Sequence, residues 1–187
     1  MKQLNTRLAA LKSIGSSAGF KERLMVTNGL FSSKLIYQIC LWGGAEDYLL
    51  QALQKVQNKA ARFVTKVPKE TSSRVMLNHC GWLNVKQLAF YHSVILVHKT
   101  LLTKQPSYLY ERLPTEFTRE TRLAGSHALR IALTNRTTLA LTERSFLHRA
   151  ILGYNSIPSE LRKLTNLTTF KTKLKLWLKD NSEHFGY

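Results

Sequence analysis

The segment between Asp47 and Val67 spaces its apolar residues for one face of an α-helix. At about 100° per residue, its apolar side chains fall within a stripe about 100° wide. Asp47 would lie in the first turn, where its negative charge complements the helix dipole, and Pro68 would stop the helix. We therefore expect an amphipathic helix whose buried stripe consists of Leu49, Leu53, Val56, Ala60, Phe63, Val64 and Val67.

Helical spacing recurs along most of the remaining chain. The stretch Gly15–Gly19, the pair Gly43-Gly44 and Pro106 mark breaks between helices. A helix start is predicted at Asn84, because Gln87 is placed three residues later to complete a reciprocal cap. The helices expected from these signals cover 4–11, 20–39, 47–67, 74–77, 84–102, 143–154 and 169–180, with a further short one after residue 158.

The pattern changes between residues 113 and 142, where Thr, Arg and single apolar residues replace the helical rows. Residues 129–133 and 137–141 read as two short strands joined by a turn at 134–136. The predicted fold class is therefore mainly α, with a helical bundle followed by a smaller α+β segment that holds this short β-hairpin. We expect three segments: helices at 1–67, connecting helices at 68–112, and a C-terminal segment with the hairpin and terminal helices at 113–187.

The charge of the chain is strongly basic. Its 28 Lys and Arg residues against 11 Asp and Glu give a formal net charge of +17. With 44% hydrophobic residues the chain has enough apolar side chains for a folded core, which a disordered basic tail lacks. A folded scaffold with this charge attracts polyanions, nucleic acid first and an anionic membrane surface second.

Part of this charge forms a ridge on a second face of the helix expected at 47–67. Lys55, Lys59, Arg62 and Lys66 fall within a sector about 60° wide, at spacings of three and four residues. Like charges at these spacings repel one another by about a few tenths of a kcal/mol per pair, and an anionic partner would relieve that repulsion. An ordinary solvated helix face is the alternative interpretation. The overall charge favours nucleic-acid contacts at these four residues.

Aromatic residues are a second class of candidate contacts, because unpaired bases stack on aromatic rings. Most of the aromatic residues recur at helical core positions, where packing accounts for them. Trp82 is the exception, since it follows Gly81 at a helix entrance. We therefore predict Trp82 as the candidate stacking residue.

The sequence offers no constellation for catalysis, for a metal or for a cofactor. Two-metal phosphoryl transfer needs converging carboxylates, but Asp occurs only at Asp47 and Asp180 and the Glu residues are scattered. Cys40 and Cys80 cannot form a four-thiolate zinc site, and a lone pair favours a reduced intracellular compartment, cytoplasm or nucleus. A lysine interrupts the longest apolar region, Leu30–Trp42, so no segment is expected to span a membrane. We expect a non-enzyme without metal, cofactor or membrane.

Eight short strings follow one another in a fixed order between residues 20 and 180. They are Leu35-Ile36-Tyr37, Leu41-Trp42-Gly43, Leu53–Arg62, Trp82–Gln87, Pro106–Leu109, Arg144–Phe146, Tyr154–Pro158 and Phe170–Lys175. The first three resemble the region just after the polymerase palm in non-LTR (LINE-type, jockey-like) retrotransposon reverse transcriptases. The later five are similar to the family's W-L-P-V-x-x-R/Q, A-P-S-Y-L, R-S-F, W-N-S-L-P and F-K-x-x-L-K elements, with Asn84 in place of the usual Pro and Tyr154 in place of the usual Trp.

The resemblance implies the thumb and the helical region that follows it, a fragment that grips template RNA and primer or target DNA in the intact enzyme. The family's catalytic carboxylates and endonuclease lie N-terminal to this region, so the implied activity is nucleic-acid binding without polymerisation. The palm and fingers segment of the parent enzyme would be a protein partner. Two alternatives stay open: a domesticated helical module that docks a protein through exposed apolar surface along Leu24, Leu30 and Leu35, and a retroelement remnant without protein function.

Overall fold

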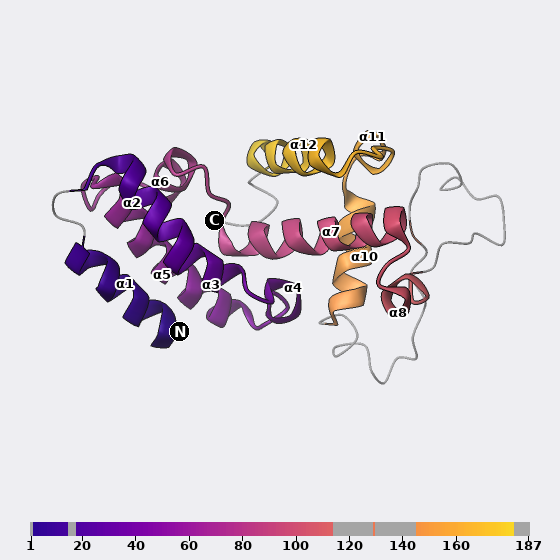
Figure 1. Ribbon diagram of the computed structural model, residues 1–187, viewed down its shortest axis with the longest axis horizontal. Coiled ribbons are helices and arrows are strands. Elements are labelled where there is room, and N and C mark those ends of the chain that lie inside the picture. Colours follow the sequence, from indigo (N-terminus) through magenta and orange to yellow (C-terminus); the bar gives the residue numbers. More distant parts are fainter. Residues whose placement is uncertain (1, 15–17, 114–128, 130–144, 182–187) are drawn as a thin grey trace. The chain divides into compact units, whose positions relative to one another are not determined.

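The protein is mainly helical, as the sequence predicts (Figure 1). The computed structural model describes residues 2–14, 18–113, 129 and 145–181, and within these ranges it has no strand. The predicted hairpin at 129–141 lies outside the described residues except for Leu129. Leu129 is buried, and its backbone N–H and C=O both pair with the Asn155 side chain, each at 2.7 Å.

The chain forms two compact units, one built from residues 1–39 and 45–88 and the other from 40–44 and 89–187. Helix α7 (Val85–Thr103) begins in the first unit and continues into the second. The boundaries that we predicted after residues 67 and 112 do not separate these units, and the division into three segments stays a prediction.

The long helix α5 (Asp47–Thr65) organises the first unit, because α1 (Lys2–Ile14), α2 (Phe20–Thr27) and α6 (Ser73–His79) all pack against it. On α1, the three leucines at helical spacing are buried as expected. Near the end of α5, Ala61 and Val64 pack with residues of α6 into one apolar cluster. The main core residues of this unit are Leu4, Leu8, Leu11, Phe31, Leu35, Val56, Ala60, Ala61, Val64, Met76 and Leu77.

The prediction of one continuous helix over 20–39 is wrong. After α2 the chain widens into the π-helical turn η1 (Asn28–Ser32), continues as α3 (Ser33–Ile36), and breaks before α4 (Ile39–Trp42), where Gln38 has a positive φ of 53°. The buried residues Thr27, Phe31 and Leu35 recur every fourth position, so a regular α-helix would rotate each by about 40° from the last. One wide turn keeps these side chains facing the core.

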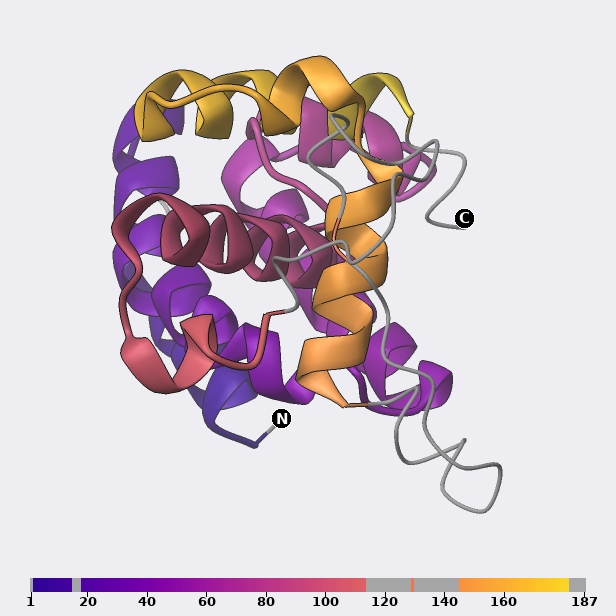
Figure 2. The same cartoon turned by 90° about the vertical axis from the view of Figure 1, so that its right-hand side faces the viewer.

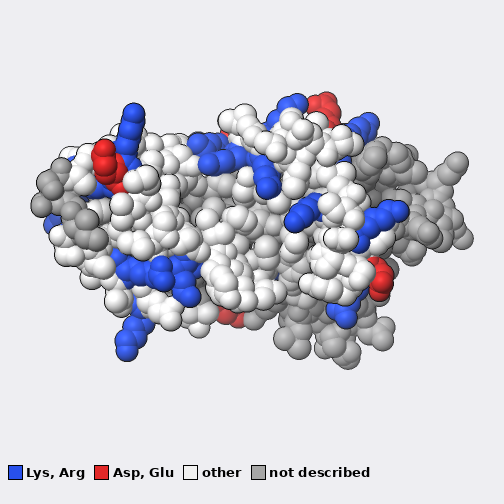
Figure 3. Space-filling view, in the orientation of Figure 1, with Lys and Arg blue, Asp and Glu red and all other residues white. Residues whose placement is uncertain are grey.

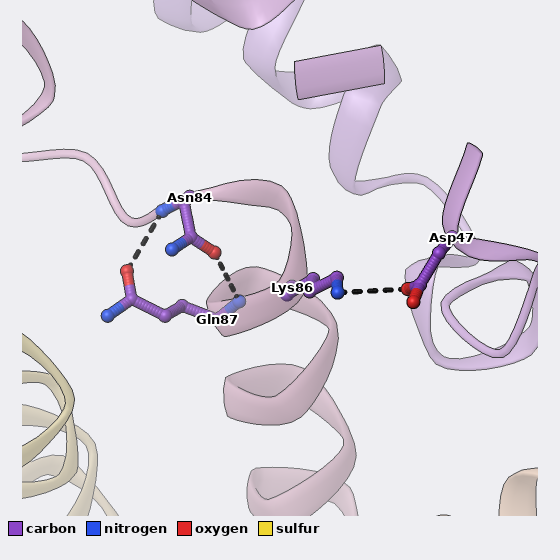
Figure 4. Close-up of polar contacts among 4 residues, drawn as sticks. All are labelled: Asp47, Asn84, Lys86 and Gln87. Atoms are coloured by element: carbon purple, nitrogen blue, oxygen red, sulfur yellow. Dashed lines mark hydrogen bonds and ion pairs between the residues drawn. The ribbon is translucent and has the colours of Figure 1, made fainter. Parts of the chain in front are cut away.

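The predicted cap at the start of α7 is confirmed. The Gln87 backbone N–H donates to Asn84 Oδ1 at 2.7 Å, and the Asn84 backbone N–H donates to Gln87 Oε1 at 3.0 Å (Figure 4). Both residues are buried, so the reciprocal pair satisfies donors that water cannot reach. The polar sequence signal at Asn84 therefore fixes where α7 begins.

In the second unit, α10 (Phe146–Ser156) crosses α7, and α12 (Leu167–Asp180) runs antiparallel beside α7 (Figures 1 and 2). The short helices α8 (Ser107–Tyr110) and α11 (Ser159–Arg162) follow α7 and α10 in the chain. The crossing is close at Gly153, where an added Cβ would lie 3.0 Å from the Phe90 ring. The core of this unit is formed by Val94, Val97, His98, Ala150, Ile151, Tyr154, Ile157, Phe170, Leu174 and Leu178.

His98 is the polar centre of this second core and is only 1% exposed. Its Nε2 lies 2.8 Å from the Leu164 carbonyl, which can only accept, so Nε2 carries the proton and Nδ1 accepts from the Tyr154 hydroxyl at 3.2 Å. The ring stacks on Phe170 at a centroid distance of 3.7 Å. Burial raises the pKa of Tyr154 to about 12, which keeps its hydroxyl protonated as this donor. His98 thus joins α7, α10 and α12.

Candidate nucleic-acid interface

Helix α5 presents two of the predicted lysines, Lys55 and Lys59, as exposed side chains one turn apart. The opposite face is fixed in the core, since Val56 is 5% exposed and Ala60 and Val64 are 0% exposed. The sequence has no Asp or Glu from Leu49 to Lys69, so no acidic side chain of α5 beyond its first turn offsets these charges. The outer face of α5 therefore has the positive potential that attracts polyanions.

The buried stripe of α5 is rotated from the one that we predicted. Leu49 is 39% exposed, whereas Leu50, Gln57 and Ala61 are buried. The buried face of α5 is therefore rotated by about 45° around the helix axis, toward Leu50. The hydropathy pattern does not predict this rotation, because Gln57 counts as polar and its burial depends on a partner from another segment.

That partner is the chain entering α7, and two glutamines of α5 hold it. Gln57 Nε2 donates to the Leu83 carbonyl at 2.9 Å, and Gln54 Oε1 accepts from the Val85 N–H at 2.8 Å. Gln54 Nε2 in turn donates to Gln57 Oε1 at 2.9 Å. The sequence analysis did not predict a role for these residues. The signal that could have indicated it is the spacing of two glutamines, three positions apart at the edge of an apolar stripe. They set the rotation of α5, and hence the direction in which Lys55 and Lys59 point.

Lys66 does not belong to the helical ridge. Helix α5 ends at Thr65, and Lys66 adopts the left-handed conformation with φ 53° and ψ 27° as the C-terminal cap. Its backbone N–H donates to the Arg62 carbonyl at 2.9 Å, which satisfies one of the last carbonyls of the helix. The prediction extended the helix to Val67 because only Pro68 signalled its end. The Lys66 side chain is exposed beside the ridge but outside its regular spacing.

Arg62 is half-buried and has a structural contact. Its Nη2 donates to the Lys69 carbonyl at 3.2 Å, which holds the loop that follows α5. The guanidinium of Arg62 therefore serves the fold as well as the charge of the ridge. Of the four predicted contact residues, Lys55 and Lys59 are the ones that α5 presents as exposed side chains.

One basic residue of the first unit is buried. Arg23 on α2 is 7% exposed, and its Nε donates to the Val64 carbonyl at 3.0 Å while its Nη1 donates to the Ala18 carbonyl. A cation at the last turn of α5 complements the helix dipole there. The basic composition thus contains residues that hold the fold together as well as residues that face solvent, and Figure 3 shows Lys and Arg covering far more of the visible surface than Asp and Glu.

An ion pair lies at the N-terminal end of α5, away from the ridge. Lys86 Nζ is 2.9 Å from Asp47 Oδ1, beside the cap of α7 (Figure 4). Both side chains are partly exposed, so the pair contributes little to stability. Asp47 and Lys55 are separated by about 12 Å along the helix axis, so this carboxylate does not offset the charge of the ridge.

Trp82 packs at the rim of the apolar cluster formed by α5 and α6. Its indole N–H donates to Asn28 Oδ1 at 2.9 Å, and the side chain is half-buried. These contacts account for Trp82 as a packing residue that joins η1 to the entrance of α7. Its role in stacking on a base stays a prediction.

The three leucines named for a protein-docking surface differ in exposure: Leu35 is buried, Leu24 is half-buried and Leu30 is exposed. Leu35 is 2% exposed, and Leu24 packs against the cluster of α5 and α6. Leu30 is 40% exposed, and its backbone carbonyl accepts a hydrogen bond from Arg7 of α1 at 2.7 Å. Docking of a protein through this surface stays a prediction.

The described parts of the chain contain no group of three or more His, Cys, Asp or Glu side chains placed to hold a metal ion. None of the helices within those parts combines the length and the apolar character needed to cross a membrane. Comparison with protein families, with curated proteins and with solved structures finds no match for this chain.

Proposed function

We propose that this chain binds RNA or DNA through the phosphate backbone, and that it corresponds to the thumb and following helical region of a non-LTR retrotransposon reverse transcriptase. The exposed lysines of α5 carry the proposal. Lys55 and Lys59 stand on a helix that the two glutamines Gln54 and Gln57 and buried apolar residues hold in one orientation. Their mutual repulsion at this spacing is relieved when a phosphate lies between them.

The residues that carry the family resemblance fall at positions with structural roles, which supports the proposal. The string Leu53–Arg62 lies within α5, and Trp82–Gln87 forms the entrance to α7. Both departures from the family pattern have local partners: Asn84 accepts the Gln87 N–H, and Tyr154 donates to His98. At position 84 the family's usual Pro could not make the hydrogen bond that Asn84 makes. At position 154 the usual Trp would make a hydrogen bond with a geometry different from that of Tyr154.

The proposed role is non-catalytic. The chain would hold template or primer strands, within the cytoplasm or the nucleus, while polymerisation belongs to the palm of the parent enzyme. Lysine contacts to phosphates carry no sequence information, so the binding is expected to be strong at low salt and indifferent to sequence. The palm and fingers segment is the protein partner that this role implies.

The test is a mobility-shift titration with single-stranded RNA and with duplex DNA at two salt concentrations, comparing the natural chain with a Lys55→Gln/Lys59→Gln variant. Two lost contacts should lower the slope of log K against log salt by about 1.4 on a single strand and about 1.8 on a duplex. The matched control is Lys2→Gln/Lys12→Gln, which removes the same charge from exposed positions on α1. An equal loss in both variants would contradict the assignment to α5.

A further inference from the structure

Helix α12 carries a second row of lysines that the ridge of α5 does not include. Lys171, Lys175 and Lys179 recur every fourth residue, so they lie along one side of the helix at steps of about 6 Å. Lys171 and Lys175 are exposed and Lys179 is half-buried. The adjacent face of α12, about 100° around the helix, packs in the core of the second unit, because Phe170, Leu174 and Leu178 are each 0% exposed.

No carboxylate of the same segment offsets this row. The sequence has no Asp or Glu from Leu161 to Lys179, and Asp180 points about 100° away from Lys179 around the helix. Burial, and then the charge of Lys179, lowers the pKa of Lys175. The charges of Lys175 and Lys179 are therefore close enough to repel each other.

His92 on α7 lies within the electrostatic influence of Lys171, the first lysine of this row. Burial lowers the pKa of its imidazole, and the charge of Lys171 lowers the pKa further. The Tyr91 ring contacts the His92 ring edge-on at 5.3 Å, and the Tyr91 hydroxyl donates to the Lys171 carbonyl at 3.4 Å. The start of the lysine row is thus fixed against α7 before any ligand arrives, which reduces the entropy lost on binding.

We infer that Lys171, Lys175 and Lys179 form a second surface for the phosphate backbone of nucleic acid, carried by the second unit. This inference rests on the proposed function, and it adds a binding surface to it. Regularly spaced ammonium groups suit the repeating phosphates of a strand, because lysine binds phosphate as a point charge. A membrane surface is a poorer fit, since a helix that binds a membrane inserts an apolar face, and here Phe170, Leu174 and Leu178 are buried in the protein, which leaves Leu176 alone exposed among the leucines of α12.

The experiment measures the salt dependence of binding for the full chain with Lys171→Gln/Lys175→Gln/Lys179→Gln. The probes are a single-stranded RNA and a DNA duplex. The slope of log K against log salt should fall by about 0.7 per lost contact on RNA, hence by about 1.4 to 2.1 for two or three contacts. The matched control is Lys99→Gln/Lys163→Gln/Lys173→Gln, three exposed lysines of the same unit, and its slope should change by less than one contact. An unchanged slope in the α12 variant overturns the inference.

A second readout is the pKa of His92, followed by the NMR shift of its ring protons. Phosphate bound at Lys171 offsets the lysine charge, so saturation with RNA should raise the pKa of His92. Lys171→Gln should raise it in the absence of RNA. A pKa of His92 that does not respond to RNA overturns the inference even if the affinity changes.

The outcomes separate this inference from the proposed function. If the natural chain binds neither RNA nor duplex DNA, both are overturned. If the α5 variant weakens binding and the α12 variant does not, only the second surface is overturned. If phosphatidylserine vesicles raise the pKa of His92 and RNA does not, the choice of nucleic acid as the ligand of this lysine row is overturned.

Discussion

Replacing His98 with leucine should destabilise the second unit by about 2–4 kcal/mol. The change leaves the Tyr154 hydroxyl without its acceptor and the Leu164 carbonyl without its donor. Each buried polar group left unsatisfied costs about 1–3 kcal/mol, and the lower end applies to the carbonyl because its hydrogen bond is only part-buried. Leucine cannot reproduce the stack on Phe170. The loss is a large fraction of the 5–15 kcal/mol that is typical of a folded domain.

Urea denaturation followed by far-UV circular dichroism measures this loss, and hydrogen exchange of the α12 amides locates it in the second unit. His98→Gln is the matched control, because its amide can still donate to the Leu164 carbonyl and should cost less. Tyr154→Phe removes the hydroxyl, so the double variant His98→Leu/Tyr154→Phe should cost less than the sum of the single variants. A His98→Leu protein within about 0.5 kcal/mol of the natural chain, or strict additivity in the double variant, would refute the role given to this network.

Three further predictions concern stability. Burial lowers the pKa of His98 below its ordinary value near 6.5, so folding favours the neutral imidazole. This contribution to the stability is complete above about pH 6.5, and it is lost by up to about 1.4 kcal/mol per pH unit as the pH falls toward the folded-state pKa. Urea titrations at several pH values should show this loss for the natural chain and not for His98→Gln. Asn84→Ala removes the cap of α7 and should cost about 1 kcal/mol in the same denaturation assay, more than Lys86→Ala, which removes only a partly exposed ion pair. Gly153→Leu forces side-chain atoms into the Phe90 ring, 3.0 Å from the added Cβ, and should lower stability by about 1–3 kcal/mol; a stability equal to that of the natural chain would contradict the close crossing of α7 and α10.

Local signals in the sequence were sufficient where a segment depends on itself. The leucines of α1 are buried, and Asn84 and Gln87 form the cap that their spacing predicts. The prediction of one helix over 20–39 was wrong because Thr27, Phe31 and Leu35 are buried at every fourth residue, which requires a wide turn. Whether these residues are buried depends on the helices that pack against this segment. Helical periodicity alone does not contain that information.

In the candidate site, too, local features could be predicted from the sequence and features that depend on tertiary contacts could not. Lys55 and Lys59 lie on the outer face of α5, as the helical angles predict. The exact rotation of α5 depends on Gln57 and the Leu83 carbonyl, which lie 26 residues apart in the chain. Lys66 was misplaced because a lysine gives no sign that it will take the left-handed cap, a conformation that usually belongs to glycine.

The central claim is that lysines of this chain bind nucleic-acid phosphates, and the salt dependence of the natural chain's affinity for single-stranded RNA tests it most directly. Contacts from Lys55 and Lys59 alone predict that log K falls by at least about 1.4 per tenfold rise in salt. The slope should become shallower in Lys55→Gln/Lys59→Gln and stay the same in Lys2→Gln/Lys12→Gln. An affinity that does not change with salt, or a slope that is unchanged after removal of the α5 lysines, would contradict the account.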